Sequence, residues 1–255
     1  MHALVCGSTQ GIGFEAARLL SERGARITLI ARNENALMGA VELLDGSEGQ
    51  KHDYLVADFS LPDSLKSVIQ QYVKDGARPN ILINNTGGPK GGPIIDAAPE
   101  EFIAAFNQHL ICNHILVQAL TPGMKENGYG RIINVISTSV KQPLSNLGVS
   151  NTIRGAVASW SKTLANELGQ FNITVNNVLP GATNTGRLQS IAETKAGKTE
   201  QSVEEVFSDM AAESPMKRIA APKEIAEAIA FLASPRASYI NGINLPVDGG
   251  RTKSL

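Results

Sequence analysis

A run of glycines and small polar residues near the start of the chain has the composition of a phosphate-binding loop. The apolar residues Ala3 to Cys6 lead directly into Gly7-Ser8-Thr9-Gln10-Gly11-Ile12-Gly13, and apolar residues at helical spacing follow. Glycine lets the backbone approach a pyrophosphate without interference from a Cβ, and a helix start offers unpaired N–H groups and a partial positive charge. The spacing Gly-x3-Gly-x-Gly differs from the better known Gly-x-Gly-x-x-Gly, and taken alone it fits an ordinary tight turn equally well.

The residue type at the end of the second apolar run indicates which dinucleotide the chain would select. Residues 26–30 are short and β-branched and are followed by Ala31 and Arg32, where a nucleotide-binding unit contacts the adenosine ribose. An acidic side chain there would accept hydrogen bonds from a free 2'-hydroxyl, whereas a guanidinium would pair with a 2'-phosphate. Arg32 therefore favours NADP(H) over NAD(H); the alternative is a solvated charge at a strand end.

Strand and helix patterns alternate along the chain and would position these groups. The third apolar run ends at Asp58, where adenine would lie, and the fourth ends in Asn84-Asn85-Thr86-Gly87. Unbroken apolar runs that end in polar residues and glycine are typical of central parallel strands, whose carboxyl ends face the ligand crevice. We find no internal repeat or low-complexity segment, so the sequence predicts a single α/β domain over residues 1–255.

In this order the motifs resemble those of the short-chain dehydrogenase/reductase family, over nearly the whole chain. Asn134, Pro180-Gly181 with Thr185, and Val247-Asp248-Gly249-Gly250 extend the resemblance. It implies a single Rossmann-like doubly wound domain, with a seven-stranded parallel sheet and helices on both faces. The cofactor-binding residues implied by the resemblance are Gly7, Ser8, Thr9, Gln10, Gly11, Ile12, Gly13, Arg32, Asp58, Asn85, Gly87, Arg154, Pro180, Gly181, Thr183 and Thr185.

The catalytic positions depart from the family pattern. Family members carry a Ser after the fifth strand, then a Tyr, a Lys four residues later, and an Asn on the preceding long helix. Here Ser137 matches the serine, Ser150 takes the tyrosine's place and Arg154 the lysine's, and counting back from Pro122 puts His109 at the asparagine. The tyrosine, with a pKa of about 10, protonates the nascent alkoxide, and a serine hydroxyl is a much poorer donor. Arg154 can still hold ribose hydroxyls through its planar fork.

Two further side chains could take part in the chemistry. Lys141 falls in a loop that would overhang the nicotinamide, where it could contact a substrate carboxylate or donate a proton; the alternative is a solvated loop lysine. His109 has a titration range suited to proton transfer, although a helix histidine with Asn113 one turn on is more often a hydrogen-bonded structural residue.

Two segments could close over the crevice. Residues 87–93 are rich in Gly and Pro and predict a fixed loop over the crevice mouth, or else a plain surface turn. Residues 183–216 are polar, with a helical pattern around Val203, Val206 and Met210. We expect them to form the substrate lid, because a segment of this length inside a compact domain is usually functional.

The sequence leaves two classes of function open. It resembles a divergent branch of the family, similar to β-ketoacyl-carrier-protein reductases, and also a reductase type that delivers hydride to a conjugated C=C bond. The first hypothesis is an NADP(H)-dependent oxidoreductase acting on a small carbonyl or conjugated enone, and the second is a nucleotide-binding pseudoenzyme serving as a sensor or subunit. The first is favoured by the retained Ser137, Pro180-Gly181 and Thr185, and the second by Ser150. The family implies a homotetramer or homodimer.

Composition argues against several kinds of partner. The 255 residues carry a formal net charge of -1, with 42% hydrophobic and 18% charged residues, so nothing favours a nucleic acid or a membrane surface. We expect a small-molecule substrate and no metal. The two cysteines, Cys6 and Cys112, lie in apolar runs, and the strand pattern begins at residue 3, which leaves no room for a signal peptide. We therefore expect a cytoplasmic protein.

Overall fold

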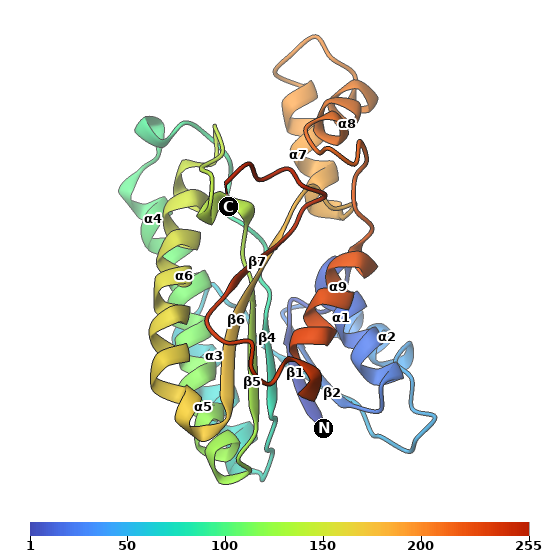
Figure 1. Ribbon diagram of the computed structural model, residues 1–255, viewed down its shortest axis with the longest axis vertical. Coiled ribbons are helices and arrows are strands. Elements are labelled where there is room, and N and C mark those ends of the chain that lie inside the picture. The colour runs from blue at the N-terminus through green and yellow to red at the C-terminus, as the bar shows by residue number, and fades with distance from the viewer. Residues whose placement is uncertain (255) are drawn as a thin grey trace.

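A single parallel sheet, with strand order β3-β2-β1-β4-β5-β6-β7, forms the centre of the molecule (Figure 1). The structure is a computed structural model, and it describes residues 1–254. The strand order reverses between β1 and β4, and in open α/β sheets the ligand crevice lies at this point, beyond the carboxyl ends of the strands. The strands are β1 (His2–Cys6), β2 (Arg26–Ala31), β3 (Asp53–Val56), β4 (Ile81–Asn84), β5 (Gly130–Val135), β6 (Ile173–Pro180) and β7 (Asn244–Val247).

Helices cover both faces of the sheet, which confirms the predicted doubly wound architecture (Figure 1). One layer contains α1, α2 and α9, and the other contains α3 to α6. Because both faces are covered, the central strands are apolar on both sides, and Ile81 to Ile83 have no exposed surface. The helices are α1 (Gly11–Glu22), α2 (Glu34–Glu42), α3 (Pro62–Lys74), α4 (Pro99–Phe106), α5 (Cys112–Glu126), α6 (Gly148–Leu168), α7 (Gly186–Ala196), α8 (Val203–Ala212) and α9 (Pro222–Leu232).

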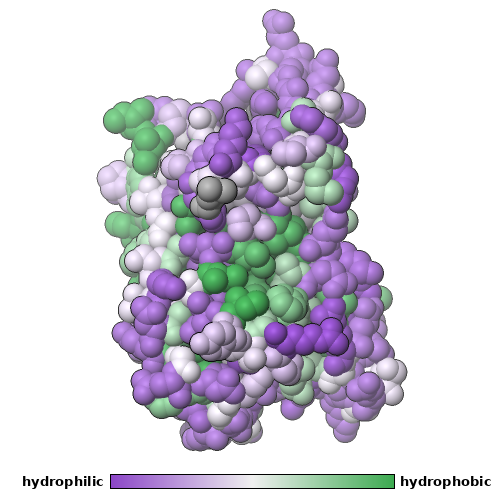
Figure 2. Space-filling model, viewed as in Figure 1, coloured by the Kyte–Doolittle hydropathy of each residue, from purple (hydrophilic) through white to green (hydrophobic). Residues whose placement is uncertain are grey.

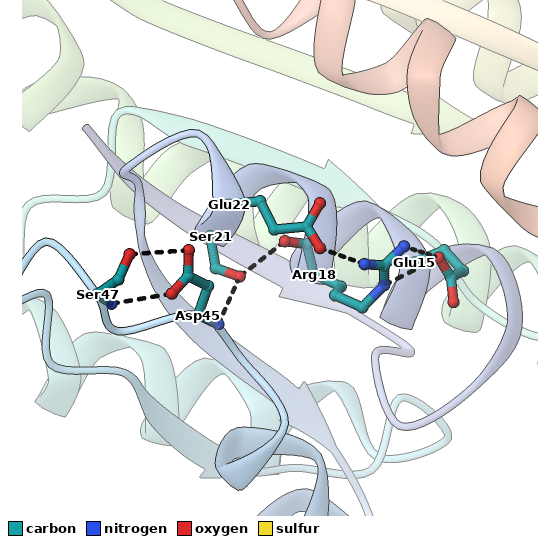
Figure 3. Close-up of polar contacts among 6 residues, drawn as sticks. All are labelled: Glu15, Arg18, Ser21, Glu22, Asp45 and Ser47. Atoms are coloured by element: carbon teal, nitrogen blue, oxygen red, sulfur yellow. Dashed lines mark hydrogen bonds and ion pairs between the residues drawn. The ribbon is translucent and has the colours of Figure 1, made fainter.

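Side chains along α1 bond to one another, and its buried Ser21 connects the helix to the turn after α2 (Figure 3). Arg18 pairs with Glu15, at 3.0 Å, and with Glu22. The buried hydroxyl of Ser21 donates to the Arg18 carbonyl oxygen at 2.7 Å and accepts from the Asp45 N–H at 3.1 Å. These bonds hold in place the helix that begins at the glycine loop.

Helices α4 and α5 do not form one continuous α-helix. Residues Asn107–Ile111 form a π-helical turn between α4 and α5, and this turn contains about one residue more than a regular α-helical turn. His109 lies within this turn and is fully buried. Single π-helical turns inside α-helices occur often at functional sites, because they place a side chain that regular spacing would turn elsewhere.

Four asparagines form a row across strands β4 to β7, in which Asn244 is half-buried and the other three are buried. Asn84, Asn134, Asn177 and Asn244 are register partners on β4, β5, β6 and β7. Their side-chain amides bond in sequence, at 2.8 Å from Asn84 to Asn134, 3.0 Å from Asn134 to Asn177 and 2.8 Å from Asn177 to Asn244. The row satisfies polar groups that would otherwise be buried at a cost of about 1 to 3 kcal/mol each.

The polar segment 183–216 contains two helices, α7 and α8, which pack against each other at the end of the molecule opposite the N-terminus (Figure 1). The helical pattern predicted around Val206 corresponds to α8, where Val206 is buried, whereas α7 was not expected. Within residues 1–254, no helix has the length and hydropathy needed to cross a membrane.

Candidate functional site

The glycine loop between β1 and α1 is packed so tightly that a side chain would not fit. A Cβ at Gly7, whose φ is +56°, would lie 2.3 Å from the carbonyl oxygen of Asn85, and one at Gly13 would lie 2.3 Å from the carbonyl oxygen of Gly7. The Asn85 side chain donates to the Gly7 carbonyl oxygen at 3.2 Å. Since the Gln10 side chain does not cap α1 in the described chain, the helix start remains open to an anion. These residues fit the pyrophosphate of a dinucleotide.

Other residues predicted to bind the cofactor pack around the glycine loop. The buried Ser8 hydroxyl accepts from the Ile30 N–H at 3.2 Å, which joins the loop to β2. The methyl group of Thr185 would lie 3.3 Å from a Cβ at Gly11, so the start of α7 closes over the loop. Thr9 is half-buried, and Ile12 packs against the core beneath the loop. Ser8 and Ile12 thus support the loop from inside.

Arg32 and Asp58 follow two neighbouring strands, and the charge of Arg32 acts on the Asp58 carboxyl. The Arg32 side chain is exposed, and its charge contributes to lowering the pKa of the Asp58 carboxyl, which is lowered mainly by hydrogen bonds from Ser60. The Ser60 N–H donates to Asp58 at 2.8 Å. Arg32 belongs to none of the ion pairs within residues 1–254. Its guanidinium is therefore available to a phosphate at the end of β2.

The residues that follow Pro180 form the other wall of the crevice. A Cβ at Gly181 would lie 2.7 Å from the Cα of Asp248, so the Asp248-Gly249-Gly250 turn lies directly against β6. The Thr183 hydroxyl donates to the Gly181 carbonyl oxygen at 3.0 Å, and Thr185 caps α7 by accepting from the Leu188 N–H. The Gly87 carbonyl oxygen accepts a hydrogen bond from the Gln108 side chain at 3.3 Å.

Thr86 joins Arg154 to His109 beneath the crevice. The Arg154 guanidinium donates to the backbone carbonyl oxygens of Val135 at 3.2 Å and of Thr86 at 3.3 Å. The Thr86 hydroxyl and Nδ1 of His109 share a hydrogen bond of 2.6 Å. Nε2 of His109 is buried without a hydrogen-bond partner among residues 1–254. Thr86 lies in the Asn-Asn-Thr-Gly motif, but nothing in its residue type identified it as this connection.

Burial determines the charge state of both groups. It lowers the pKa of His109 to about 2, with the Arg154 charge as a second cause, so the imidazole is neutral at physiological pH. Burial, followed by the charge of Arg187, lowers the pKa of Arg154 to about 10, so the guanidinium stays charged. A neutral, buried His109 fits a positioning role better than that of a proton donor.

Ser137 and Lys141 lie at the two ends of one short turn, and Ser150 lies on helix α6. Ser137 begins a short 3-10 turn (Thr138–Val140), where its hydroxyl accepts from the Ser139 N–H at 3.1 Å, and Lys141 ends that turn. Ser150 is half-buried in the first turn of α6, one helical turn before Arg154.

None of the four tyrosines, all within the described chain, takes over the missing position. The Tyr72 hydroxyl lies 2.6 Å from that of Thr28 near the start of the sheet, and the Tyr129 hydroxyl donates to Ala233. The Tyr54 hydroxyl bonds to Glu34 on α2, and Tyr239 is fully exposed before β7. Three of these hydroxyls are therefore engaged elsewhere and the fourth is fully exposed.

A cavity of about 260 Å³ lies beside the 3-10 turn, and its lining includes the end of the chain. The backbone N–H of Lys253 donates to the Gln142 side chain at 3.4 Å, which brings the tail to this wall. The sequence offered no signal for this contact. The lining residues are Thr138, Gln142, Leu144, Glu213, Arg251, Thr252 and Lys253.

The sheet with its switch point and the glycine cradle define a dinucleotide-binding α/β domain. The family model described as enoyl-(acyl carrier protein) reductase matches residues 7–252. The chain is 33% identical to 3-oxoacyl-(acyl-carrier-protein) reductase FabG of Vibrio cholerae, over 97% of this chain and 96% of that protein. It is 30% identical to the NADPH-dependent reductase BacG of Bacillus subtilis, over 99% and 98%. The chain belongs to the short-chain dehydrogenase/reductase family, and it is an NAD(P)-dependent oxidoreductase.

Solved structures agree with this assignment. The structure of YwfH, an NADPH-dependent reductase involved in bacilysin biosynthesis, superposes with a TM-score of 0.93 at 29% identity and covers 100% of this chain and 99% of that one. L-sorbose reductase from Gluconobacter frateurii, complexed with NADPH and L-sorbose, superposes with a TM-score of 0.92 at 31% identity and covers 100% and 97%. The predicted family and fold are thus confirmed.

Proposed function

We propose that this protein is an NADP(H)-dependent reductase that acts on a small substrate with an activated C=C bond. Relatives named as NADPH-dependent support the choice of cofactor. So does the exposed Arg32 at the end of β2, which has no ion-pair partner within residues 1–254. When bound, NADPH supplies a hydride to the electrophilic carbon of the substrate. The glycine loop would hold its pyrophosphate, Arg154 its nicotinamide ribose, and Arg32 its 2'-phosphate.

The observation that carries the choice of acceptor is the half-buried serine at position 150, in a site without a nearby tyrosine. Reduction of an isolated ketone leaves an alkoxide, which needs a proton as the hydride arrives. Reduction of a conjugated enone leaves an enolate, a weaker base whose charge is spread over oxygen and carbon. A site with serine hydroxyls therefore suits the second reaction better than the first.

In this proposal the protein stabilises the enolate and leaves protonation of the carbon to water. The Ser137 hydroxyl would donate to the enolate oxygen, with help from Ser150 or from the Lys141 ammonium. Helices α7 and α8 would cover the bound substrate, as expected for the predicted lid over residues 183–216. Because hydrogen bonds strengthen when water is excluded, closure of this segment would raise the effect of each donor.

The test measures NADPH oxidation with matched pairs of conjugated enones and their saturated ketones. We expect turnover of enones well above that of the ketones. Ser137→Ala should lower the rate about 10²- to 10³-fold, the usual loss for one oxyanion donor. Ser159→Ala, on the exposed face of the same helix as Ser150, is the matched control and should keep the full rate.

Two outcomes would contradict the proposal in different ways. Good reduction of β-ketoacyl thioesters with no reduction of enones would show that the acceptor is a carbonyl. Tight NADPH binding without turnover of any compound would favour the nucleotide-binding pseudoenzyme, for which the replacement of tyrosine by Ser150 is the supporting feature.

A further inference from the structure

Two arginine side chains from distant parts of the sequence converge on the backbone of Gly88. A Cβ built at Gly88 would lie 3.8 Å from an NH2 nitrogen of Arg187 and 4.0 Å from one of Arg154. Arg154 belongs to α6, and Arg187 belongs to the first turn of α7. Arg187 also donates to the Pro89 carbonyl oxygen at 2.6 Å, which fixes it beside the glycine- and proline-rich loop.

No carboxylate balances these two charges within residues 1–254. The ion pairs of the described chain involve five other arginines: Arg18, Arg23, Arg26, Arg218 and Arg251. The Arg154 side chain has only 7% of its surface exposed, and its two bonds go to neutral carbonyl oxygens. Burying an uncompensated charge is costly, and a second like charge beside it adds to the cost.

We propose that Arg154 and Arg187 bind a carboxylate of the substrate, which rests on the reductase function proposed above. An anion near Gly88 would lie within reach of both guanidinium groups and would supply the missing negative charge. Guanidinium groups match the planar geometry of a carboxylate and form charge-assisted hydrogen bonds with it.

The position of the pair favours the substrate over the cofactor as the source of the anion. Arg154 lies one helical turn after Ser150, so the anion would be held next to the predicted reacting hydroxyls. The cofactor phosphates have their own site at the glycine loop and Arg32, at the switch point between β1 and β4. The substrate class is then a small free carboxylic acid with an activated double bond, and not a thioester, whose reacting end is uncharged.

Equilibrium binding tests this inference without the need for turnover. The NADP⁺-loaded protein is titrated by calorimetry with 4-oxopent-2-enoate and with its methyl ester, and then with pairs of longer acids and esters. We expect the acid of at least one pair to bind about 10- to 100-fold more tightly than its ester, the usual effect of a charge-assisted pair. Arg187→Gln should remove this preference, and Arg187→Lys should restore part of it.

Matched controls separate the two sources of anion. Lys195→Gln removes one positive charge from the exposed end of the same helix and should leave the acid preference intact. NADPH affinity, measured by fluorescence titration, should be the same in Arg187→Gln as in the unchanged protein. An equal loss of NADPH affinity would assign Arg187 to the cofactor and overturn the inference.

The outcome is distinguishable from failure of the proposed reaction. Acid-selective binding that depends on Arg187 supports the carboxylate site even if no compound is reduced. Equal affinity for acid and ester in every pair, or absence of binding by any acid, overturns it even if enones are turned over.

Discussion

The hydroxyl of Thr86 lies 2.6 Å from Nδ1 of His109. Through this contact the end of β4 holds the π-helical turn, and the carbonyl group of the same threonine holds the buried Arg154. One residue therefore positions two side chains, His109 and Arg154, that the sequence predicts at the family's asparagine and lysine positions. The Arg154 guanidinium depends on Thr86 for one of its two backbone acceptors.

Replacing Thr86 by valine should destabilise the fold, because the ring nitrogen of His109 would lose its partner inside the protein. The loss of a partner for one buried polar group costs about 1 to 3 kcal/mol. Thr86→Ser keeps the hydroxyl and should retain most of that stability. Urea denaturation at neutral pH measures both variants, and equal stability of the two would show that the bond contributes nothing.

The low pKa of His109 predicts a loss of stability in acid. The folded-state pKa of about 2 lies below the ordinary histidine value of 6.5, so between these values the unfolded chain binds a proton that the folded chain does not. The contribution of His109 to stability is fully present above about pH 6.5. As the pH decreases below that value, the free energy of unfolding should fall by up to about 1.4 kcal/mol per pH unit because of this residue.

His109→Asn should make that pH dependence less steep, because asparagine does not titrate. His2, whose pKa burial lowers to about 4, acts in the same direction and remains in both proteins. Denaturation curves at pH 7, 6 and 5 give the two slopes. Identical slopes would mean that His109 takes up a proton in the folded protein.

Gly7→Ala should abolish dinucleotide binding and destabilise the protein. The positive φ of Gly7 is unfavourable for alanine, and the new Cβ would lie 2.3 Å from the Asn85 carbonyl oxygen. The control is Gly39→Ala, because a Cβ at Gly39, inside α2, has no neighbour within 4 Å in the described chain. That change should raise stability by about 0.5 to 1 kcal/mol. Calorimetric titration with NADPH and thermal unfolding give both results.

Arg32→Asp should weaken NADPH binding by about 10- to 100-fold, since a charge-assisted hydrogen bond contributes about 1.5 to 3 kcal/mol. NADH lacks the 2'-phosphate and should bind at least as well as before. The ratio of the two dissociation constants is the measurement. Equal losses of affinity for both cofactors would show that Arg32 is a surface charge that does not bind the 2'-phosphate.

We expect the protein to form a homotetramer, or at least a homodimer, in solution. Apolar side chains gather over the middle of the face on which β7 runs (Figure 2), and β7 is an edge strand with all four residues half-buried. Phe231 of α9 is 40% exposed. Pairing of two copies would cover this edge. Light scattering at micromolar concentration should give a mass that is a multiple of 27 kDa. Phe231→Glu should lower this mass. A monomeric mass for the unchanged chain would refute the expectation.

The sequence predicted those parts of the fold that depend on local pattern. Alternating apolar runs and helical spacing place β1, α1 and β4, and the glycines at positions 7, 11 and 13 predict the tight loop between strand and helix. Apolar strand runs with polar ends indicate the carboxyl edge of the sheet, because parallel strands align their ends. Each of these signals is contained in a short stretch of sequence, so residue spacing alone reveals it.

Parts of the site that depend on distant contacts were not predictable. Arg187 lies 33 positions after Arg154 in the sequence, and nothing in either neighbourhood shows that both approach Gly88. The π-helical turn at His109 packs against α6, and nothing in the spacing of the neighbouring residues indicates that contact. The tail at Lys253 reaches Gln142 across 111 positions.

The row of asparagines across β4 to β7 bears on how the strands find their alignment. Most other residues of these strands are apolar on both faces, so a strand displaced by one residue would bury similar side chains and lose little hydrophobic energy. The amides remove this ambiguity, because displacement of any of the four strands would leave buried donors and acceptors unmatched with their neighbours. The asparagines in these largely apolar strands thus favour the native register when the sheet assembles.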